Sequence, residues 1–542
     1  MTATTVTRDK PSLVLRLRDS LSRHAQAPAV EGQRTVLSYA ELERRSAALA
    51  RSLRDAGVCR GDIVPLLMGR SPQLVIAQLA VLRLGAAYAP IDLASPAPRQ
   101  QAMLQVLRST VIVTDGATPS AAAGDAVVID ANDVAQHPAD DAFAPWVGDD
   151  PNAAACVMFT SGTTGAPKGV VVPQSGIARL VCDADFAELQ PRSRWGFLSS
   201  PAFDASTLEV WAPLLNGGCC VAQEDALPSL DDLANFLLSK RITDTWLTAA
   251  LFNAMVEDRL DAFGELRQLL TGGERVSPRH AQAVLKAHPT LRLVNGYGPT
   301  ENTTFTLCRT ITWDDTENVA GIPIGQPIRG TTVRVGIDAQ ETNDGELLAG
   351  GAGVALGYLN EPELSAQKFI VLDGRRWYRT GDLVHRRADG AFEFRGRVDR
   401  QVKIQGHRVE LEEVETLLRS CPGVGDAAVL MRGDSAESQH LVACFSGIGG
   451  GAPTSDAVAE FLGERLPLPA VPKRFIAMQR WPLSLNGKLD RAALAARVDE
   501  QAHALARADL RWRSHAEEAL AGIWKRCLPA SAIHRHASFL AI

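Results

Sequence analysis

The sequence predicts an α/β protein with a large N-terminal domain of parallel sheets and helical crossovers, a β subdomain, and a small, mobile C-terminal α+β domain. A chain of 542 residues is too long for one hydrophobic core. Apolar residues make up 46% and charged residues 22% of it, as is typical of globular domains. Helix-like and strand-like segments alternate at first, and short β segments with Gly and Asp turns follow from about residue 320.

The first 250 residues carry the alternation of helices and strands. Ser38 and Glu41 are spaced as in a capping box, at the start of a helix that Gly57 ends. Strand, helix and strand in succession favour parallel pairing with helical crossovers. Strands are expected at residues 63–68 and 244–250, buried strands at 111–113 and 126–129, and helices at 13–24, 72–84 and 230–240.

The pattern changes after residue 320. Residues 396–410 indicate a polar crossing followed by a β-hairpin, and a helix and two strands then predict a small α+β domain. An Ala-rich, charged stretch at residues 493–515 is typical of a helical linker. The predicted divisions are a core domain at 1–397, a mobile subdomain at 398–495, a linker at 496–515, and the start of another domain at 516–542.

Bulk properties exclude several classes of protein. The net charge of −6 gives no basic patch for nucleic acid, and no run approaches about 18 apolar residues, so no membrane span is expected. Met1 to Lys10 is polar and unlike a secretory signal. The nine cysteines form no Cys-x-x-Cys pair, which favours free thiols in the cytoplasm and argues against a zinc site.

A glycine- and hydroxyl-rich loop follows the apolar segment 153–159. Its glycines allow close backbone approach to a ligand, and its N–H and hydroxyl groups suit phosphate oxygens. The spacing differs from that of the common P-loop, and a solvated loop between strands is the alternative. The residues are Phe159, Thr160, Ser161, Gly162, Thr163, Thr164, Gly165, Ala166, Pro167, Lys168, Gly169 and Val170.

These twelve residues resemble the phosphate loop of adenylate-forming enzymes, specifically the amino-acid-activating adenylation domains of non-ribosomal peptide synthetases. The resemblance implies conversion of ATP and an amino acid to aminoacyl-AMP and pyrophosphate, then transfer to a phosphopantetheine thiol on a carrier domain. Ten segments match in the family's order: 37–42, 81–92, 159–170, 203–206, 295–301, 345–359, 378–383, 396–410, 466–472 and 486–491.

The resemblance also implies roles for single residues. Lys488 would be the catalytic lysine that bridges substrate carboxylate and nucleotide, and Glu301 would bind Mg²⁺. Asp399 would be the hinge, and Gly406 would line the pantetheine channel. Without the resemblance, Lys488 is a solvated lysine in a two-residue turn and Glu301 is a surface glutamate after a Pro-Thr turn. The expected ATP-binding residues are Thr160, Ser161, Gly162, Thr163, Thr164, Gly165, Lys168, Tyr297, Asp382 and Arg397.

Asp204, in the segment Phe203-Asp204-Ala205-Ser206, matches the family's clamp for the α-ammonium group. The remaining pocket positions offer no partner to a charged side chain, and they resemble those of valine-activating domains. 2-Aminobutyrate, isoleucine and threonine stay open, because an apolar pocket discriminates a methylene by only ~1–3 kcal/mol. The expected lining is Asp204, Ala205, Leu208, Trp246, Leu270, Gly272, Gly296, Thr304 and Phe305.

Residues 516–542 resemble the first helix and loop of a carrier domain, whose arm-bearing Ser would lie beyond Ile542. We therefore expect a part of a longer synthetase, with a carrier domain and an MbtH-like accessory protein as candidate partners. Two other classes remain. A carboxylate–CoA ligase of the same fold is disfavoured by Asp204 and the carrier-like tail, and an inactive scaffold by the intact catalytic positions.

Overall fold

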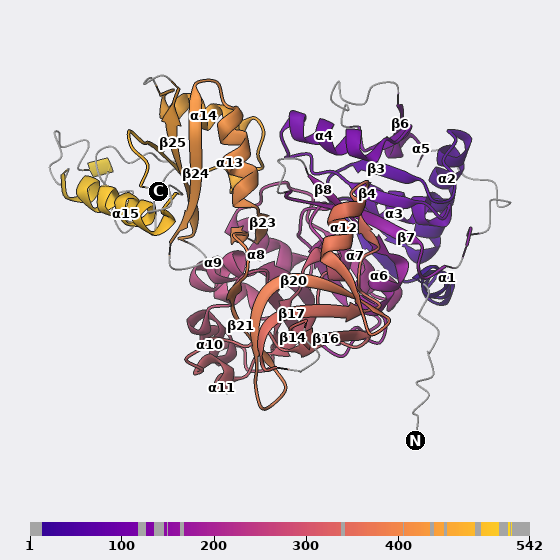
Figure 1. Cartoon of the computed structure of the whole chain (residues 1–542). Coiled ribbons are helices and arrows are strands. Elements are labelled where there is room, and N and C mark those ends of the chain that lie inside the picture. The colour runs from indigo at the N-terminus through magenta and orange to yellow at the C-terminus, as the bar shows by residue number, and fades with distance from the viewer. Residues whose placement is uncertain are drawn as a thin grey trace. The chain divides into compact units, whose positions relative to one another are not determined.

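The computed structural model describes residues 13–116, 126–134, 146–148, 150–162, 167–337, 342–404, 406–433, 438–448, 452–482, 489–508, 519–520 and 522. Contacts within the chain define two compact units, Met1–Glu410 and Leu411–Ile542 (Figure 1). The first unit holds large, mostly parallel sheets with helical crossovers, and the second is a smaller α+β unit. The predicted fold class is therefore confirmed.

A nine-stranded sheet forms one half of the first unit. Its six central strands are parallel, and antiparallel strands close both edges. The spatial order is β15 (Gln326–Pro327), β14 (Leu307–Thr310), β13 (Arg292–Tyr297), β12 (Gln268–Gly272), β11 (Asp244–Thr248), β9 (Arg194–Phe197), β10 (Cys219–Ala222), β1 (Pro28–Glu31) and β2 (Val36–Ser38).

A seven-stranded sheet forms the other half. Its order is β18 (Gly357–Tyr358), β8 (Lys168–Pro173), β7 (Ala154–Thr160), β4 (Ala87–Pro90), β3 (Ile63–Leu67), β5 (Val111–Thr114) and β6 (Val127–Asp130). Strand β6 lies at the sheet edge, where Val127 is 50% and Val128 42% exposed. The prediction of a buried strand at 126–129 is thus wrong about burial, because an apolar run does not reveal that its strand is at an edge.

A helix layer joins the two sheets. Helices α3 (Pro72–Arg83), α6 (Gln174–Val181) and α7 (Ala205–Leu215) are almost wholly buried. Helix α3 contacts β1 of the larger sheet and β3 and β4 of the smaller one. Trp211 Nε1 of α7 donates to the Tyr88 hydroxyl of β4 at 2.9 Å. The two sheets therefore share one core.

The other helices of the first unit cover the sheets or connect strands. The predicted capping box is confirmed, since Ser38 and Glu41 cap each other's backbone N–H groups at the start of α2. The bounds are α1 (Leu13–Arg23), α2 (Tyr39–Asp55), α4 (Ala97–Leu107), α5 (Ala131–Val134), α8 (Leu230–Ser239), α9 (Ala249–Arg259), η2 (Leu260–Phe263), α10 (Pro278–Ala287), η3 (Thr300–Asn302), α11 (Trp313–Thr316) and α12 (Pro362–Lys368).

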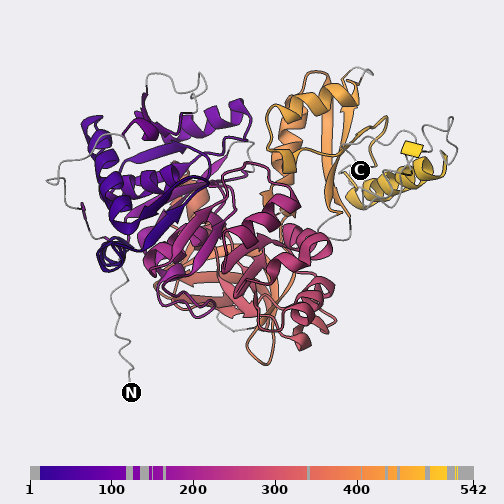
Figure 2. The same ribbon diagram turned by 180° about the vertical axis from the view of Figure 1, so that it is seen from behind.

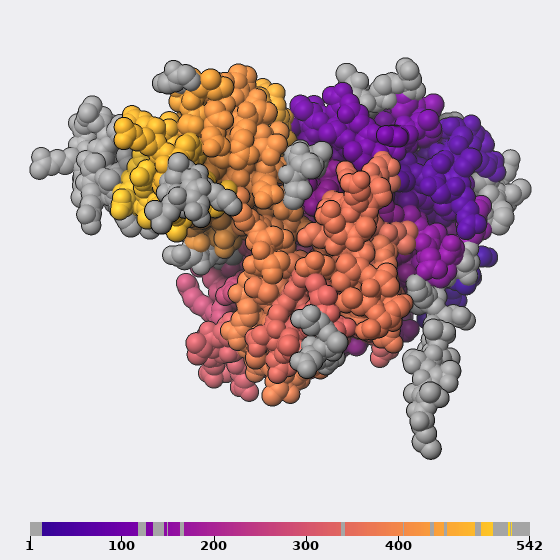
Figure 3. All heavy atoms as spheres, viewed as in Figure 1, coloured from indigo at the N-terminus to yellow at the C-terminus, as the bar shows by residue number. Residues whose placement is uncertain are grey.

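A five-stranded antiparallel sheet completes the first unit, and its salmon-to-orange residues lie at the surface in Figure 3. Its strands are β16 (Thr331–Val335), β17 (Asp344–Gly351), β20 (Arg375–Arg386), β19 (Phe369–Leu372) and β21 (Phe392–Arg397). The hairpin of β22 (Val402–Ile404) and β23 (His407–Val409) follows. It belongs to the first unit by contacts, whereas the sequence predicts the domain boundary after residue 397. The domain limits stay predictions.

The second unit is built on the sheet β24 (Val424–Arg432), β25 (His440–Gly447) and β26 (Arg474–Ala477). Its helices are α13 (Leu411–Ser420), α14 (Ser455–Gly463), η4 (Leu468–Ala470) and α15 (Arg491–Ala508). Helix α15, yellow in Figure 2, packs Leu494 and Val498 into the unit's core, with 0% and 1% exposure. Arg491 also pairs with Glu415 of α13 at 3.1 Å. The core of this unit therefore extends past residue 495, where the sequence places the start of the linker.

Within the described residues, every helix is too short or too polar to cross a bilayer.

We predict that Leu494→Ala destabilises the second unit by about 2–5 kcal/mol, because it leaves a cavity under helix α15. Hydrogen exchange of the β24 and β25 amides in the full chain would measure this loss. Glu500→Ala, at an exposed position of the same helix, is the control and should change stability by less than about 0.5 kcal/mol. Equal protection in both variants would mean that α15 is not part of the core.

Candidate active site

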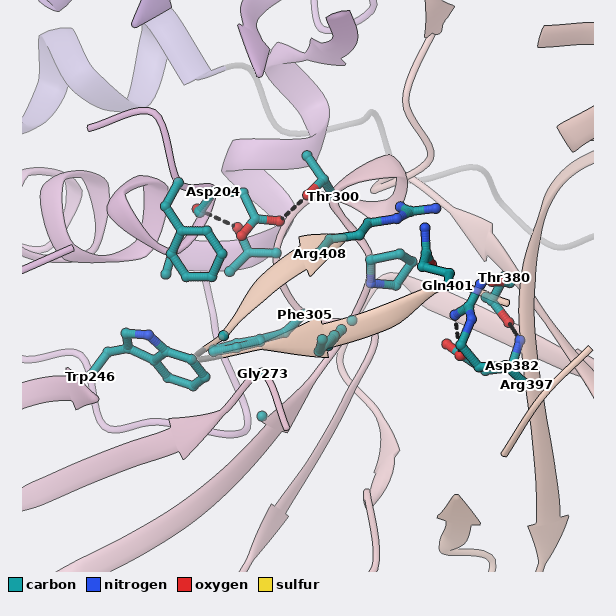
Figure 4. Close-up of a pocket in the computed structure, with 18 residues that line it drawn as sticks. Asp204, Trp246, Gly273, Thr300, Phe305, Thr380, Asp382, Arg397, Gln401 and Arg408 are labelled. Carbon is teal, nitrogen blue, oxygen red and sulfur yellow. Dashed lines mark hydrogen bonds and ion pairs between the residues drawn. The ribbon is translucent and has the colours of Figure 1, made fainter. Parts of the chain in front are cut away.

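A cavity of about 60 Å³ opens where β11, β12 and β13 end (Figure 4). Ligands of open parallel sheets bind at the carboxyl ends of the strands, so this is the expected edge. The predicted residues that line the cavity are Asp204, Ala205, Trp246, Gly296, Thr304, Phe305, Asp382, Arg397 and Gly406. Three predicted pocket positions are absent from the lining. Leu208 and Leu270 are fully buried in the core, and Gly272 packs against Trp246.

Two aromatic rings close one end of the cavity. The ring centroids of Trp246 and Phe305 lie 5.2 Å apart. A Cβ at Gly296 would lie 2.5 Å from the Phe305 ring, and a Cβ at Gly272 would lie 2.1 Å from the carbonyl oxygen of Gly296. Glycine is therefore required at both positions for Phe305 and strand β13 to lie where they do.

Asp204 lies directly before helix α7 and faces the cavity. Its carboxylate accepts a hydrogen bond from Thr300 Oγ1 at 2.7 Å, and its carbonyl oxygen accepts one from Thr304 Oγ1 at 2.9 Å. Figure 4 shows Asp204 and Thr300 pointing toward each other on one side of the two rings. Burial raises the pKa of Asp204, while the Thr300 hydrogen bond and the charge of Lys403 lower it. The cavity thus offers one acidic acceptor beside an apolar end.

Glu301 is fully buried and is held in its ionised form. Arg408 Nη1 lies 2.7 Å and 2.9 Å from its two carboxylate oxygens, and the Tyr358 hydroxyl donates to it at 2.7 Å. Burial raises the pKa of Glu301, but the charges of Arg408 and Lys168 outweigh burial and lower the pKa to about 2. The predicted metal ligand is therefore a charged, buried carboxylate, paired with Arg408, which lines the cavity.

The hairpin segment 401–410 reaches the phosphate loop as well. Glu410 lies 3.5 Å from Lys168 Nζ, and Ser161 Oγ donates to the carbonyl of Arg408 at 2.8 Å. Thr160 Oγ1 is buried and makes no hydrogen bond to any described residue. Gly162 is buried too. Three loop residues, Thr163, Thr164 and Gly165, and the predicted catalytic Lys488 lie outside the described residues.

Asp382 of β20 lies at the other end of the cavity. Its carboxylate accepts hydrogen bonds from the Tyr297 hydroxyl and from Arg397, which also pairs with Asp399 at 2.6 Å. Gly406 donates its N–H to Glu274 at 2.7 Å, and a Cβ on Gly406 would lie 2.8 Å from Thr248. Asp382, Arg397 and Gly406 thus line the same cavity.

Several site residues were not predicted as such. These residues lie in segments that match the family, but the match gave them no role. They are Thr300, Lys403, Arg408 and Glu410. Their partners are far away in the sequence, as Ser161 and Arg408 are, 247 residues apart. Such pairs follow from the topology and carry no local signal.

The turn from Glu301 to Phe305 is strained. Thr303 and Thr304 adopt left-handed backbone conformations with φ of 52° and 63°. Branched residues rarely adopt this region, and each such residue costs roughly 1–3 kcal/mol. Strain of this size persists only where the surroundings fix the backbone, which makes the turn a built part of the site.

The comparisons with known proteins agree with this geometry. The profile of the AMP-binding enzyme family matches residues 17–359. A linear gramicidin synthase of Brevibacillus parabrevis is 37% identical over 96% of this chain, and malpibaldin synthetase of Mortierella alpina is 38% identical over 97%. The chain spans only 7% and 10% of the lengths of these two relatives.

Solved structures are similar over nearly the whole chain. One is an NRPS protein containing adenylation and PCP domains, in its holo form and bound to a vinylsulfonamide inhibitor. It is 33% identical with a TM-score of 0.85, and the match covers 98% of this chain and 89% of that one. An o-succinylbenzoate CoA synthetase of Bacillus subtilis is 20% identical with a TM-score of 0.78, covers 89% of this chain and 98% of that one, and shares the fold.

The chain therefore belongs to the AMP-binding enzyme family. Within that family it is an ATP-dependent, adenylate-forming ligase of the non-ribosomal peptide synthetase type.

We predict that Arg408→Met destabilises the chain by about 3–5 kcal/mol at pH 7, because Glu301 is left as an unpaired buried charge. The folded-state pKa of Glu301, about 2, is below its ordinary value of 4.5. The stability that the pair contributes is therefore present above pH 4.5 and is lost as the pH falls toward 2. The difference between wild type and variant should shrink over that interval.

Urea unfolding at pH 7 and pH 3 measures this difference. Arg16→Met is the control, because Arg16 and Asp183 form a largely exposed pair that should contribute about 0–1 kcal/mol. If Arg408→Met lowers the free energy of unfolding equally at both pH values, Glu301 is not the ionised partner of Arg408.

Proposed function

We propose that this site activates a small aliphatic amino acid, with valine as the preferred substrate, and transfers it to the phosphopantetheine thiol of a carrier domain. The observation that carries the proposal is the half-buried carboxylate of Asp204, which faces a cavity closed by Trp246 and Phe305. An ammonium group that leaves water needs a counter-charge, and Asp204 is the acid placed to supply it. An apolar side chain of the substrate would then face the two rings.

The nucleotide would occupy the other part of the site. Transfer of the adenylyl group depends mainly on positioning and on neutralising charge. Lys168 and the hydroxyl groups of Thr160 and Ser161 are the donors for phosphate oxygens, together with Gly162, Thr163, Thr164 and Gly165. Tyr297 would offer its ring to adenine, and Asp382 and Arg397 would bind the ribose and nucleotide.

The residues present fit a Mg²⁺ ion. Mg²⁺ binds one or two carboxylates together with phosphate oxygens, and Glu301 is a buried carboxylate that stays ionised. No cluster of three or more acidic, His or Cys side chains that could hold a metal occurs in the described part of the chain. Phosphate oxygens and water would supply the ligands other than Glu301. When bound, the ion would neutralise negative charge on the phosphate oxygens.

The hairpin and the nucleotide would compete for the charges of Glu301 and Lys168. Glu301 pairs with Arg408, and Lys168 lies beside Glu410. Binding of MgATP would therefore require both hairpin residues to leave, and we assign the hinge for that movement to Asp399. Lys488 would then provide the cation at the reacting carboxylate. Gly406, at the cavity wall, would border the channel for the pantetheine arm.

2-Aminobutyrate, isoleucine and threonine remain alternative substrates, because the cavity ends in apolar rings of fixed size. A carboxylate–CoA ligase is the second candidate function, since such an enzyme shares the fold, but Asp204 favours a substrate that carries an ammonium group. We further propose a cytoplasmic location and an MbtH-like protein as an accessory partner.

We predict that the wild-type chain activates valine in preference to phenylalanine, because Trp246 and Phe305 occupy the depth that an aromatic substrate needs. It should reject lysine and glutamate, for which the lining offers no partner. Amino-acid-dependent pyrophosphate exchange with ATP is the measurement. Trp246→Ala should shift the preference toward phenylalanine. Better activation of phenylalanine or a charged amino acid by the wild type would refute the pocket assignment.

Asp204→Ala should lower valine-dependent exchange by at least about 100-fold, since an ammonium left unpaired in a buried site costs several kcal/mol. The variant should gain weak activity with 3-methylbutyrate, which has the same branched end and no ammonium group. Thr300→Val is the matched control, because it removes the hydrogen bond to Asp204 and keeps the charge. Thr300→Val should lower valine-dependent exchange much less than Asp204→Ala does. Full valine activity in Asp204→Ala would place the clamp elsewhere.

A further inference from the structure

Arg179 of helix α6 is a buried charge with unusual partners. Its side chain is 4% exposed, and its guanidinium donates to the carbonyl oxygens of Phe305 at 2.6 Å, Asn302 at 2.7 Å and Thr303 at 2.8 Å. A fourth bond reaches Thr331 Oγ1 at 2.9 Å. All four acceptors are uncharged oxygens. Burying a cation without a carboxylate on these bonds is costly, so the contacts must serve a local requirement.

That requirement is the strained turn after Glu301. Thr303 and Thr304 are the two left-handed residues, and Arg179 binds carbonyls on both sides of them. The turn is fixed from a second side by Thr303 Oγ1, which donates to the carbonyl of Gly353 at 2.8 Å. Because these hydrogen bonds fix the carbonyls of Asn302, Thr303 and Phe305, the peptide groups of the turn cannot rotate freely. The left-handed backbone conformation is thereby maintained.

The same turn shapes the cavity. Phe305 contacts Trp246 at 5.2 Å and Phe186 at 5.6 Å between ring centroids, and its ring fills the space beside Gly296. Thr304 binds the backbone of Asp204. Since the Phe305 carbonyl is held by Arg179, any rotation of that peptide would move the ring at the cavity end.

We infer that Arg179 is a positioning residue that sets the depth of the amino-acid pocket by holding the Asn302–Phe305 turn. This inference rests on the proposed function, because it concerns which side chain the pocket accepts. Arg179 does not line the cavity and acts through Phe305 and Thr304. Burial lowers the pKa of Arg179 to about 10, which leaves the guanidinium charged at neutral pH and able to donate all four bonds.

The ratio of kcat/KM for valine to kcat/KM for leucine separates positioning from a general structural role. Misfolded protein lowers the measured rate for both substrates equally, so the ratio reports only the pocket of the folded chain. One methylene in a well-formed apolar pocket is discriminated by roughly 10–200-fold. A pocket whose end can move should lose most of that discrimination.

The test is pyrophosphate exchange by the full chain with valine and with leucine. Arg179→Met keeps the apolar stem and removes all four donors. We expect the valine-to-leucine ratio to fall by at least about fivefold and the KM for valine to rise about tenfold, given that small displacements of positioned groups cost up to 100-fold. Arg179→Lys keeps the charge but has fewer hydrogen-bond donors. Its valine-to-leucine ratio should lie between those of the wild type and Arg179→Met.

A milder variant covers the case in which Arg179→Met does not fold. Thr331→Val removes one acceptor of Arg179 and leaves the three backbone bonds, so a smaller shift of the ratio in the same direction is expected. Arg83→Met is the matched control. Arg83 is a buried arginine of the same unit, 3.0 Å from Glu43 and stacked on Trp146. It should lower the melting temperature and leave the ratio unchanged.

The outcomes are distinct. A wild-type ratio in Arg179→Met, or in Thr331→Val and Arg179→Lys if the first variant does not fold, would overturn the inference. An equal fall of the ratio in Arg83→Met would also overturn it. A wild-type chain that activates neither amino acid would refute the proposed function instead.

Discussion

The constraint on which this site depends is that several charged groups must stay ionised where little water reaches them. Glu301 is 0% exposed, yet its pKa is held near 2 because Arg408 and Lys168 lie close to it. Removing Arg408 would leave Glu301 buried without an ion-pair partner, which is costlier than never burying the pair. The charged groups therefore depend on one another, and the backbone segments that carry them must lie close together.

The fold provides that place. The six parallel strands of the larger sheet end at a common edge, and the helix layer of α3, α6 and α7 fixes the second sheet against the first. The ends of β11, β12 and β13 consequently border one cavity, although they are far apart in the sequence. Arg179 gives the clearest example of how the helix layer acts on the site, because it extends from α6 to the strained turn after Glu301.

The sequence predicted much of this arrangement, but only where local signals exist. The capping box at Ser38 is such a signal, and so is the glycine-rich loop that led to the family. Burial of β6 was predicted wrongly, because its position at the sheet edge depends on distant strands. The burial of Val498 was not foreseen either, since an Ala-rich helix shows little about which face it packs.

The sequence could not predict the ion-pair partners of Glu301 and Lys168, for a different reason. Arg408 and Glu410 lie in a matched segment, but their pairing with Glu301 and Lys168 reflects one arrangement of the hairpin. In the proposed function those pairs are temporary. A buried carboxylate whose pKa is near 2 remains ionised when one cation replaces another, so exchanging Arg408 for a metal ion needs no change of protonation. In the same proposal, Lys168 would exchange the carboxylate of Glu410 for a phosphate. In the proposed function, the hairpin and the nucleotide would therefore alternate on the charges of Glu301 and Lys168, so that neither charge is left without a partner.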